Sequence, residues 1–158
     1  QKRYTDHYLV TRASKGELTN NEAEKIKHLI ASMLGDDGLF KQWLGKTLSQ
    51  PKHEMDLAPV EPAFTQDQIA NELAEPDTIF ERVGGTRAIY QQCENELLVS
   101  INGDNFTLPI GDIAAVKLLT DETEFNTNEL ANAQNSLVFV QMFTILVNEG
   151  IWFNANQE

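Results

Sequence analysis

The stretch ELLVSINGDNFTL, residues 96–108, decides what kind of fold this chain can adopt. Its first six residues are rich in the aliphatic and β-branched side chains that strands favour. Asn102-Gly103 follows at once, and this dipeptide is a strong signal for a tight turn between two strands. Phe106-Thr107-Leu108 then resumes the strand pattern. The stretch therefore predicts a β-hairpin.

The sequence before this hairpin predicts more strands and one short helix. Residues 78–83 and 86–90 are β-type runs, and we interpret Gly84-Gly85 between them as a hairpin turn. Upstream, residues 65–68 (TQDQ) fit a capping box. This box predicts a short helix that continues through Leu73, with Ile69 facing inward.

Helical patterns follow the hairpin. The spacing of apolar residues predicts a helix over 113–119, with Asp112 as its cap, and a short helix beginning at Thr127. Residues 136–149 form the last and most apolar helix, ended by Gly150 and followed by the aromatic tail 151–153. Helices mixed with hairpin strands predict a small α+β domain, and this content is compatible with a winged helix. The apolar run at 137–147 is too short for a bilayer crossing, which needs ~20 residues, so we expect no membrane segment.

Two amphipathic helices are predicted near the N-terminus. Residues 22–34 and 39–48 each carry a single apolar stripe, and about four residues join them. Thr19 or Asn20 can cap the first helix, and Pro51 stops the second. Such a helical hairpin cannot enclose its own apolar faces, so it needs a partner surface, which could be another domain, a second copy of the chain in a homodimer, or both. The candidate dimerisation residues are Ile26, Leu29, Ile30, Met33, Leu39, Phe40, Trp43 and Leu44.

The charge of the chain changes sign along its length. Residues 1–52 hold nine basic and six acidic residues, a net charge of +3, whereas residues 53–158 hold three basic and eighteen acidic residues, a net charge of −15. The change falls within the proline-containing stretch 48–62, which we interpret as a linker. The acidity of the second region argues against nucleic acid as a direct partner, because phosphate binding needs basic side chains. A candidate recognition helix would offer only Lys117, and a wing only Arg82 and Arg87.

The sequence offers little for catalysis. His53, Glu54 and Asp56 could begin a metal site, but none of the three histidines starts the His-x-Asp/Glu pattern of an iron triad. There is no Gly-x-Ser-x-Gly motif, and Cys93 has no CxxC partner. We therefore expect no catalytic, cofactor-binding or metal-binding residue here. One cysteine and no signal peptide favour a cytoplasmic setting, and the abrupt start at Gln1 suggests a fragment.

Several runs resemble bacterial ribosomal oxygenases, which are JmjC-type, cupin-fold enzymes dependent on Fe(II) and 2-oxoglutarate. These runs are RYTD at 3–6, FKQWLG at 40–45, SQPKHEMDLAP at 49–59 with Glu61-Pro62, RVGGTR at 82–87 and LVNEGIWF at 146–153. The family hydroxylates an arginine of a large-subunit ribosomal protein. The resemblance implies that residues 1–57 form a dimerisation segment and residues 58–158 a winged-helix-like C-terminal domain near the substrate approach. It also implies a catalytic domain upstream that would hold Fe(II) and 2-oxoglutarate.

Two alternatives stay open at this point. The chain could be a free-standing dimeric winged-helix regulator that binds protein or nucleic acid, which would require a basic face. It could also be a complete enzyme of unfamiliar type that uses His53, Glu54 and Asp56.

Overall fold

The computed structural model describes residues 19–53 and 55–156 of the chain. They divide into two compact units between Asp37 and Gly38. The first unit contains α1 (Asn20–Gly35). The Thr19 side chain accepts from the backbone N–H of Glu22, whose carboxylate in turn accepts from the Thr19 N–H at 2.9 Å. The predicted helix and its cap are thus confirmed.

A single residue separates α1 from α2 (Asp37–Ser49), which belongs to the second unit from Gly38 onward. After the linker comes α3 (Gln66–Ala74), opened by the predicted capping box of Thr65 and Gln68. The later helices are α4 (Ile113–Asp121) and α5 (Leu137–Asn148). Three short 3-10 turns at Ile110–Asp112, Thr127–Glu129 and Ala133–Asn135 complete the helical structure of the described chain.

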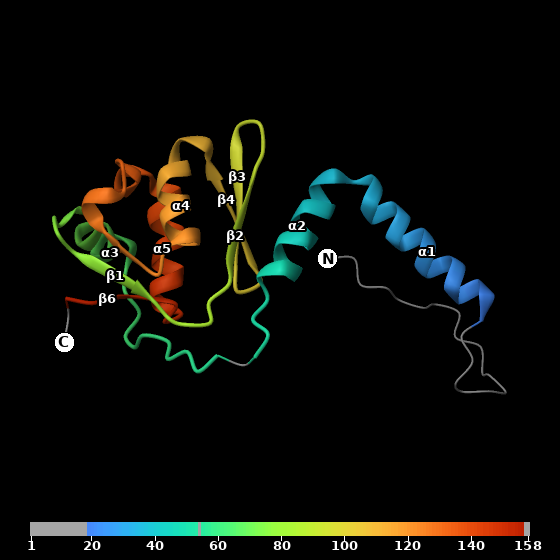
Figure 1. Cartoon of the computed structure of the whole chain (residues 1–158), viewed down its shortest axis with the longest axis horizontal. Coiled ribbons are helices and arrows are strands. Elements are labelled where there is room, and N and C mark those ends of the chain that lie inside the picture. Colours follow the sequence, from blue (N-terminus) through green and yellow to red (C-terminus); the bar gives the residue numbers. More distant parts are fainter. Residues whose placement is uncertain (1–18, 54, 157–158) are drawn as a thin grey trace. The chain divides into compact units, whose positions relative to one another are not determined.

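The strands of the described chain form two three-stranded antiparallel sheets (Figure 1). One has the order β2-β3-β4, with β2 (Ala88–Gln92), β3 (Glu96–Ile101) and β4 (Asp104–Pro109). The predicted Asn102-Gly103 turn joins β3 to β4, and both residues have positive φ. The other sheet has the order β5-β1-β6, with β1 (Ile79–Arg82), β5 (Glu124–Asn126) and β6 (Trp152–Asn154).

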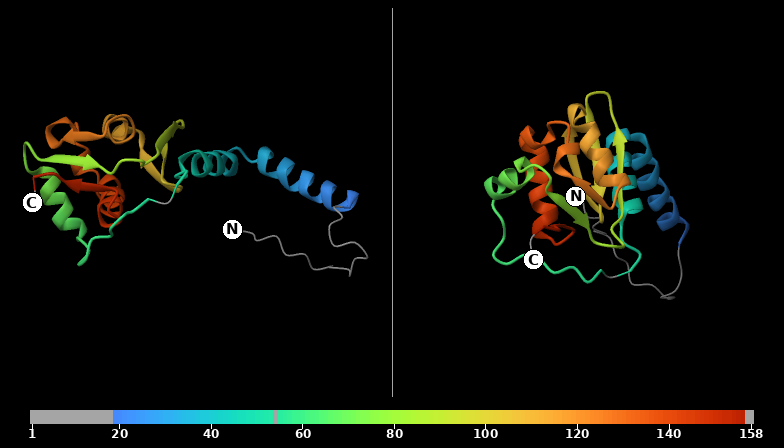
Figure 2. Two further views of the ribbon diagram at one scale, coloured as in Figure 1. Left: turned by 60° about the horizontal axis from the view of Figure 1, so that its bottom comes forward. Right: turned by 60° about the vertical axis from the view of Figure 1, so that its left-hand side comes forward.

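Aromatic side chains fill the centre of the second unit. The Phe143 ring lies 5.0 Å from that of Phe80 and 5.7 Å from that of Phe125, centroid to centroid, and Trp152 closes the group. Helix α5 supplies Phe139 and Phe143 and contacts β4 of one sheet and β6 of the other (Figure 2). The α+β fold with its hairpin sheet is confirmed. Within the described residues, no helix is both long enough and apolar enough to cross a bilayer.

Two sequence predictions are wrong in detail. Gly84-Gly85 does form a turn, with Thr86 N–H donating to Val83 O at 3.3 Å. It does not close a hairpin, because β1 and β2 belong to different sheets. Asp112 precedes α4, but its side chain does not cap it. It accepts a 2.6 Å hydrogen bond from Ser136 Oγ instead, at the start of α5.

Candidate functional site

The candidate dimerisation residues lie on α1 and α2. Along α1 no residue is buried. Six of the eight candidates are exposed and two, Phe40 and Leu44, are half-buried. The exposed candidates are Ile26, Leu29, Ile30, Met33, Leu39 and Trp43. Leu34 and Leu48, which belong to the predicted apolar stripes but not to the dimerisation candidates, are exposed as well. That these side chains meet those of a second copy stays a prediction.

Helix α2 is held against the β2-β3-β4 sheet through two small residues. Gly45 and Ser49, one turn apart, are the buried residues of this helix. A Cβ at Gly45 would overlap the side-chain oxygen of Ser100 on β3. Close approach of the helix to the sheet therefore requires glycine at this position.

Hydrogen bonds fix the position of α2 on the sheet. Gly103 N–H donates to Ser49 Oγ at 3.0 Å, and Asn105 Nδ2 donates to Gln42 O at 2.9 Å. Ser100 Oγ donates to Asn105 Oδ1 at 2.7 Å, which orients the amide. Since the sheet occupies the inner face of α2, Trp43 remains exposed on the helix.

The linker after α2 holds the residues of the metal hypothesis. His53 and Asp56 lie in it, and Glu54 falls outside the described residues. No three His, Cys, Asp or Glu side chains gather in a metal-binding group anywhere in the described chain. The linker is tied down further on, where Val60 N–H donates to Asn148 O at 2.9 Å and the Asn148 side chain pairs with the backbone of Phe64.

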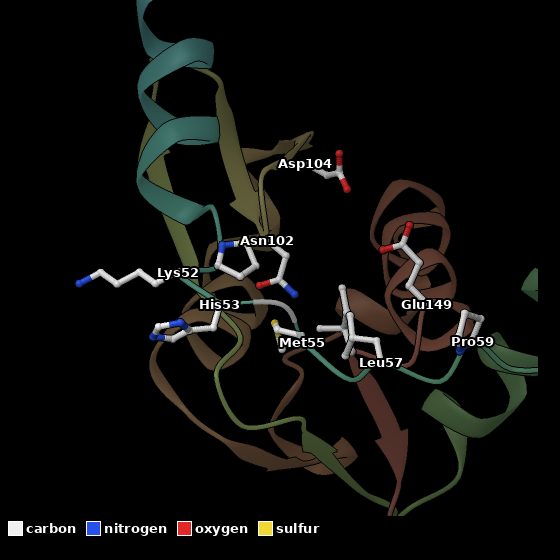
Figure 3. Close-up of a pocket in the computed structure, with 10 residues that line it drawn as sticks. Lys52, His53, Met55, Leu57, Pro59, Asn102, Asp104 and Glu149 are labelled. Carbon is white, nitrogen blue, oxygen red and sulfur yellow. The ribbon is translucent and has the colours of Figure 1, made fainter.

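A pocket of about 590 Å³ lies between this linker, the β3–β4 turn and the end of α5 (Figure 3). Asp104 and Glu149 stand at one side of it, and Lys52 and His53 extend from the other (Figure 3). Burial of the Glu149 carboxyl raises its pKa above the ordinary value, and the like charge of Asp104 adds to this effect. The pocket therefore carries acidic groups beside a partly apolar wall.

The sequence did not predict that Asn102, Asp104 and Glu149 would line the same pocket. Asn102 was predicted only as a turn residue, and Glu149 only as the end of a helix. Neither carries a motif, and more than forty residues separate them in the chain. Only the tertiary packing of α5 beside the β3–β4 turn brings them to one pocket.

Arg82, Arg87 and Lys117 were considered for nucleic-acid binding, and both arginines donate hydrogen bonds to backbone carbonyls of the same chain. Arg82 donates to Leu119 O at 2.8 Å and lies 5.7 Å from the centre of the Trp152 ring. Burial lowers the pKa of Arg82, and nearby Asp121 opposes that change. Arg87 donates to Gln50 O at 3.3 Å. The geometry therefore assembles no basic face from these residues.

Residues 26–153 match a family model described as a ROXA-like winged helix. The chain belongs to the ROXA-like winged-helix family. The match covers both sheets and all of α2, α3, α4 and α5. It confirms the winged-helix interpretation and the resemblance seen in the sequence.

Known proteins that resemble this ROXA-like winged helix include ribosomal oxygenases. The chain is 28% identical, over 150 residues, to the ribosomal protein uL16 3-hydroxylase of Escherichia coli (strain K12). That alignment covers 95% of this chain but 38% of the relative, so the chain spans well under half of the relative's length. Its fold is similar to that of YcfD, a ribosomal oxygenase from Escherichia coli, in complex with cobalt and 2-oxoglutarate, with a TM-score of 0.68 and 27% identity over 97% of this chain and 40% of that one. A second YcfD structure gives a TM-score of 0.67 at the same identity, covering 97% and 41%.

Proposed function

We propose that this chain is the dimerisation and substrate-access region of an Fe(II)- and 2-oxoglutarate-dependent oxygenase that hydroxylates an arginine of a ribosomal protein. The observation that carries the proposal is the apolar surface of α1 and α2, which the described chain leaves exposed. Solvent-exposed apolar stripes of this extent mark interaction surfaces. Family membership supplies the enzyme context.

Residues 1–57 form the dimerisation segment in this proposal, and the described part of that segment contains both amphipathic helices. Residues 58–158 form the winged-helix domain that shapes the approach of substrate. Its strong negative charge suits a basic substrate protein, because opposite charge raises the rate of encounter. The parent enzyme would act in the cytoplasm.

The described residues do not fit the iron centre of such an enzyme. An Fe(II) site of this class needs two histidines and a carboxylate in one place, and no group of three potential ligands is found in the described chain. We therefore assign no catalytic step to these residues. In this proposal the iron and 2-oxoglutarate belong to a catalytic domain upstream in the parent.

The dimer is tested with one charge-introducing substitution at two exposed leucines. Leu29→Asp on α1 should convert a dimer to a monomer, because it places a carboxylate in the apolar interface. Leu137→Asp is the matched control, since Leu137 is 73% exposed at the first residue of α5, outside the candidate set. Sedimentation equilibrium measures both masses. If the unsubstituted 158-residue chain stays monomeric at high concentration, the proposed dimer is contradicted.

The absence of a catalytic centre is tested by metal content. After anaerobic incubation with Fe(II) and 2-oxoglutarate followed by dialysis, the chain should retain far less than one iron per molecule. The measurement is elemental analysis, and succinate release in a separate aerobic incubation, where O2 is present as the oxidant, is a second readout. Stoichiometric iron or turnover by the chain alone contradicts the proposal.

A further inference from the structure

The pocket between the linker and the β3–β4 turn combines two kinds of surface. Leu57 and Pro59 contribute apolar wall, and Asp104 and Glu149 contribute carboxylates (Figure 3). Ile151 also lines the apolar part of the pocket. A ligand that fits must therefore be apolar along its length and positively charged at its end. A long basic side chain has this form, since its methylene stem packs against apolar surface while the head stays polar.

The two carboxylates lack a cationic partner among the described residues. Over residues 19–53 and 55–156, the structure shows an ion pair between Lys27 and Glu24 on α1. Neither Asp104 nor Glu149 forms an ion pair with a described residue. Lys52 and His53 extend from the opposite side of the pocket (Figure 3). Burial raises the pKa of Glu149, and the like charge of Asp104 raises it further. A cation between these carboxylates would relieve that repulsion.

Asn102 adds a hydrogen-bond donor to the same pocket. Its Oδ1 accepts from Arg87 N–H at 3.0 Å, which fixes which end of the amide faces the pocket. Its Nδ2 is buried and has no acceptor among the described residues. In Figure 3 this nitrogen is directed toward the interior of the ring of lining residues, beside Met55 and Leu57. A buried donor of this kind gains from a carbonyl oxygen, because leaving it unpaired costs about 1–3 kcal/mol.

We propose that this pocket binds an arginine side chain carried on a basic segment of a partner protein. Asp104 and Glu149 accept hydrogen bonds from the guanidinium, and the apolar wall of Leu57 and Ile151 packs against its stem and flat face. Asn102 Nδ2 donates to a peptide carbonyl of the segment, which requires the side chains that cover this buried nitrogen to move aside. A divalent metal ion fits less well, since it requires more oxygen ligands than two carboxylates.

This inference deepens the proposed substrate-access role and rests on it for the identity of the partner as a ribosomal protein. It does not depend on dimerisation. Ribosomal proteins contact RNA phosphates and so carry exposed arginines. The acidic region 53–158 would attract such a protein, and the pocket would select the arginine side chain.

Titration of the isotope-labelled 158-residue chain with the capped peptide acetyl-Gly-Arg-Gly-amide, followed by amide NMR shifts, tests the site. We expect saturable shifts at residues 102–104 and 149–151, with a dissociation constant of roughly millimolar order, because partly solvated ion pairs are weak. The same peptide with citrulline, which is neutral and nearly the same shape, should bind at least fivefold more weakly. n-Propylguanidine, which has the cation but no peptide carbonyl, should also bind more weakly than the arginine peptide.

Matched variants locate the effect. The double variant Asp104→Asn with Glu149→Gln should lose at least fivefold in affinity for the arginine peptide while its spectrum stays that of a folded protein. Glu94→Gln removes one acid at the far end of the β2–β3 hairpin and should leave affinity unchanged. Equal binding of the citrulline peptide, full affinity in the double variant, or unsaturable shifts spread over the acidic surface would each overturn the site. Equal binding of n-propylguanidine would overturn the protein segment as its ligand. These outcomes leave the oligomeric state unaffected, so failure here is distinct from failure of the proposed dimer.

Discussion

The apolar residues of helices α1 and α5 allow both to be predicted from the sequence, yet the two helices differ in how many of their residues are buried. Helix α5 buries seven residues in the second unit, among them Phe139 and Phe143. Helix α1 buries none, although it is four residues longer. An isolated helix of this length is marginal in water. The comparison teaches that α5 is stabilised by packing within its own unit, whereas the described residues give α1 a capping box but no buried side chain.

The largest expected effect comes from emptying the aromatic core beside α5. Phe143→Ala removes a fully buried ring that contacts four other aromatic side chains. It should cost about 3–5 kcal/mol of unfolding free energy. Ile30→Ala on α1, where the side chain is 53% exposed, is the counterpart and should cost under ~1 kcal/mol at protein concentrations that favour the monomer. Urea unfolding followed by tryptophan fluorescence measures both, and equal losses would erase the contrast.

A smaller effect is expected where α2 meets its sheet. Gly45→Ala places a methyl group against Ser100 and should cost about 1–3 kcal/mol through overpacking. Gly35→Ala at the end of α1 is the matched change, because a Cβ there meets nothing within 4 Å. It should be neutral or slightly stabilising, since alanine favours helix over glycine. Thermal unfolding compares the pair, and an undisturbed Gly45→Ala variant would mean that α2 is not seated on β3.

Two equivalent caps offer a third comparison. Thr19 and Thr65 make the same reciprocal capping box, the first on α1 and the second on α3. Thr65→Ala should lower global stability by about 1 kcal/mol, because α3 is anchored by buried Ile69 and Leu73. Thr19→Ala should reduce the protection of α1 amides from hydrogen exchange and leave the unfolding of the second unit unchanged. A global loss from Thr19→Ala would show that α1 folds cooperatively with the rest.

The smallest effect concerns pH. The pKa of Glu149 is raised in the folded chain, so the folded state holds this proton more tightly than the unfolded chain does. Stability from this group is therefore complete below the unfolded pKa and is lost as pH rises through the folded pKa. Glu149→Gln should stabilise the protein at pH 7 by a few tenths of a kcal/mol, about 0.3, since the group is largely solvated.

The gain in stability from Glu149→Gln should vanish near pH 4, where the Glu149 carboxyl of the unsubstituted chain takes up its proton. Urea midpoints at both pH values provide the test. Glu94→Gln serves as the exposed control and should leave the midpoint unchanged. If Glu149→Gln lowers the free energy of unfolding at pH 7, the predicted direction of the effect is wrong.

Much of the fold could be predicted because its signals are local. Capping boxes at Thr19 and Thr65 and the Asn102-Gly103 turn each act within a few residues, and the structure has all of them. Strands β5 and β6 were missed because three residues are too few to show a period of two. The prediction that Gly84-Gly85 joins two paired strands was wrong, because β1 pairs with the distant strands β5 and β6 and not with β2.

The candidate site was less accessible to sequence reasoning. The apolar stripes on α1 and α2 follow from spacing alone, so the dimerisation candidates could be named in advance. The pocket could not, because the linker, a turn and a helix end contribute to it from distant parts of the chain. The nearest sequence signal was the excess of acids after residue 52, which indicates a basic partner but gives no location.

The seat of α2 on its sheet also sets the direction in which Trp43 points. Ser49 accepts a hydrogen bond from the backbone of Gly103, and a Cβ at Gly45 would meet Ser100, so these contacts fix the rotational setting of the helix relative to β3 and β4. Each residue of an α-helix turns the chain by about 100°. One residue inserted between Trp43 and Gly45 would therefore leave the seat intact while swinging the indole about a quarter-turn around the helix axis.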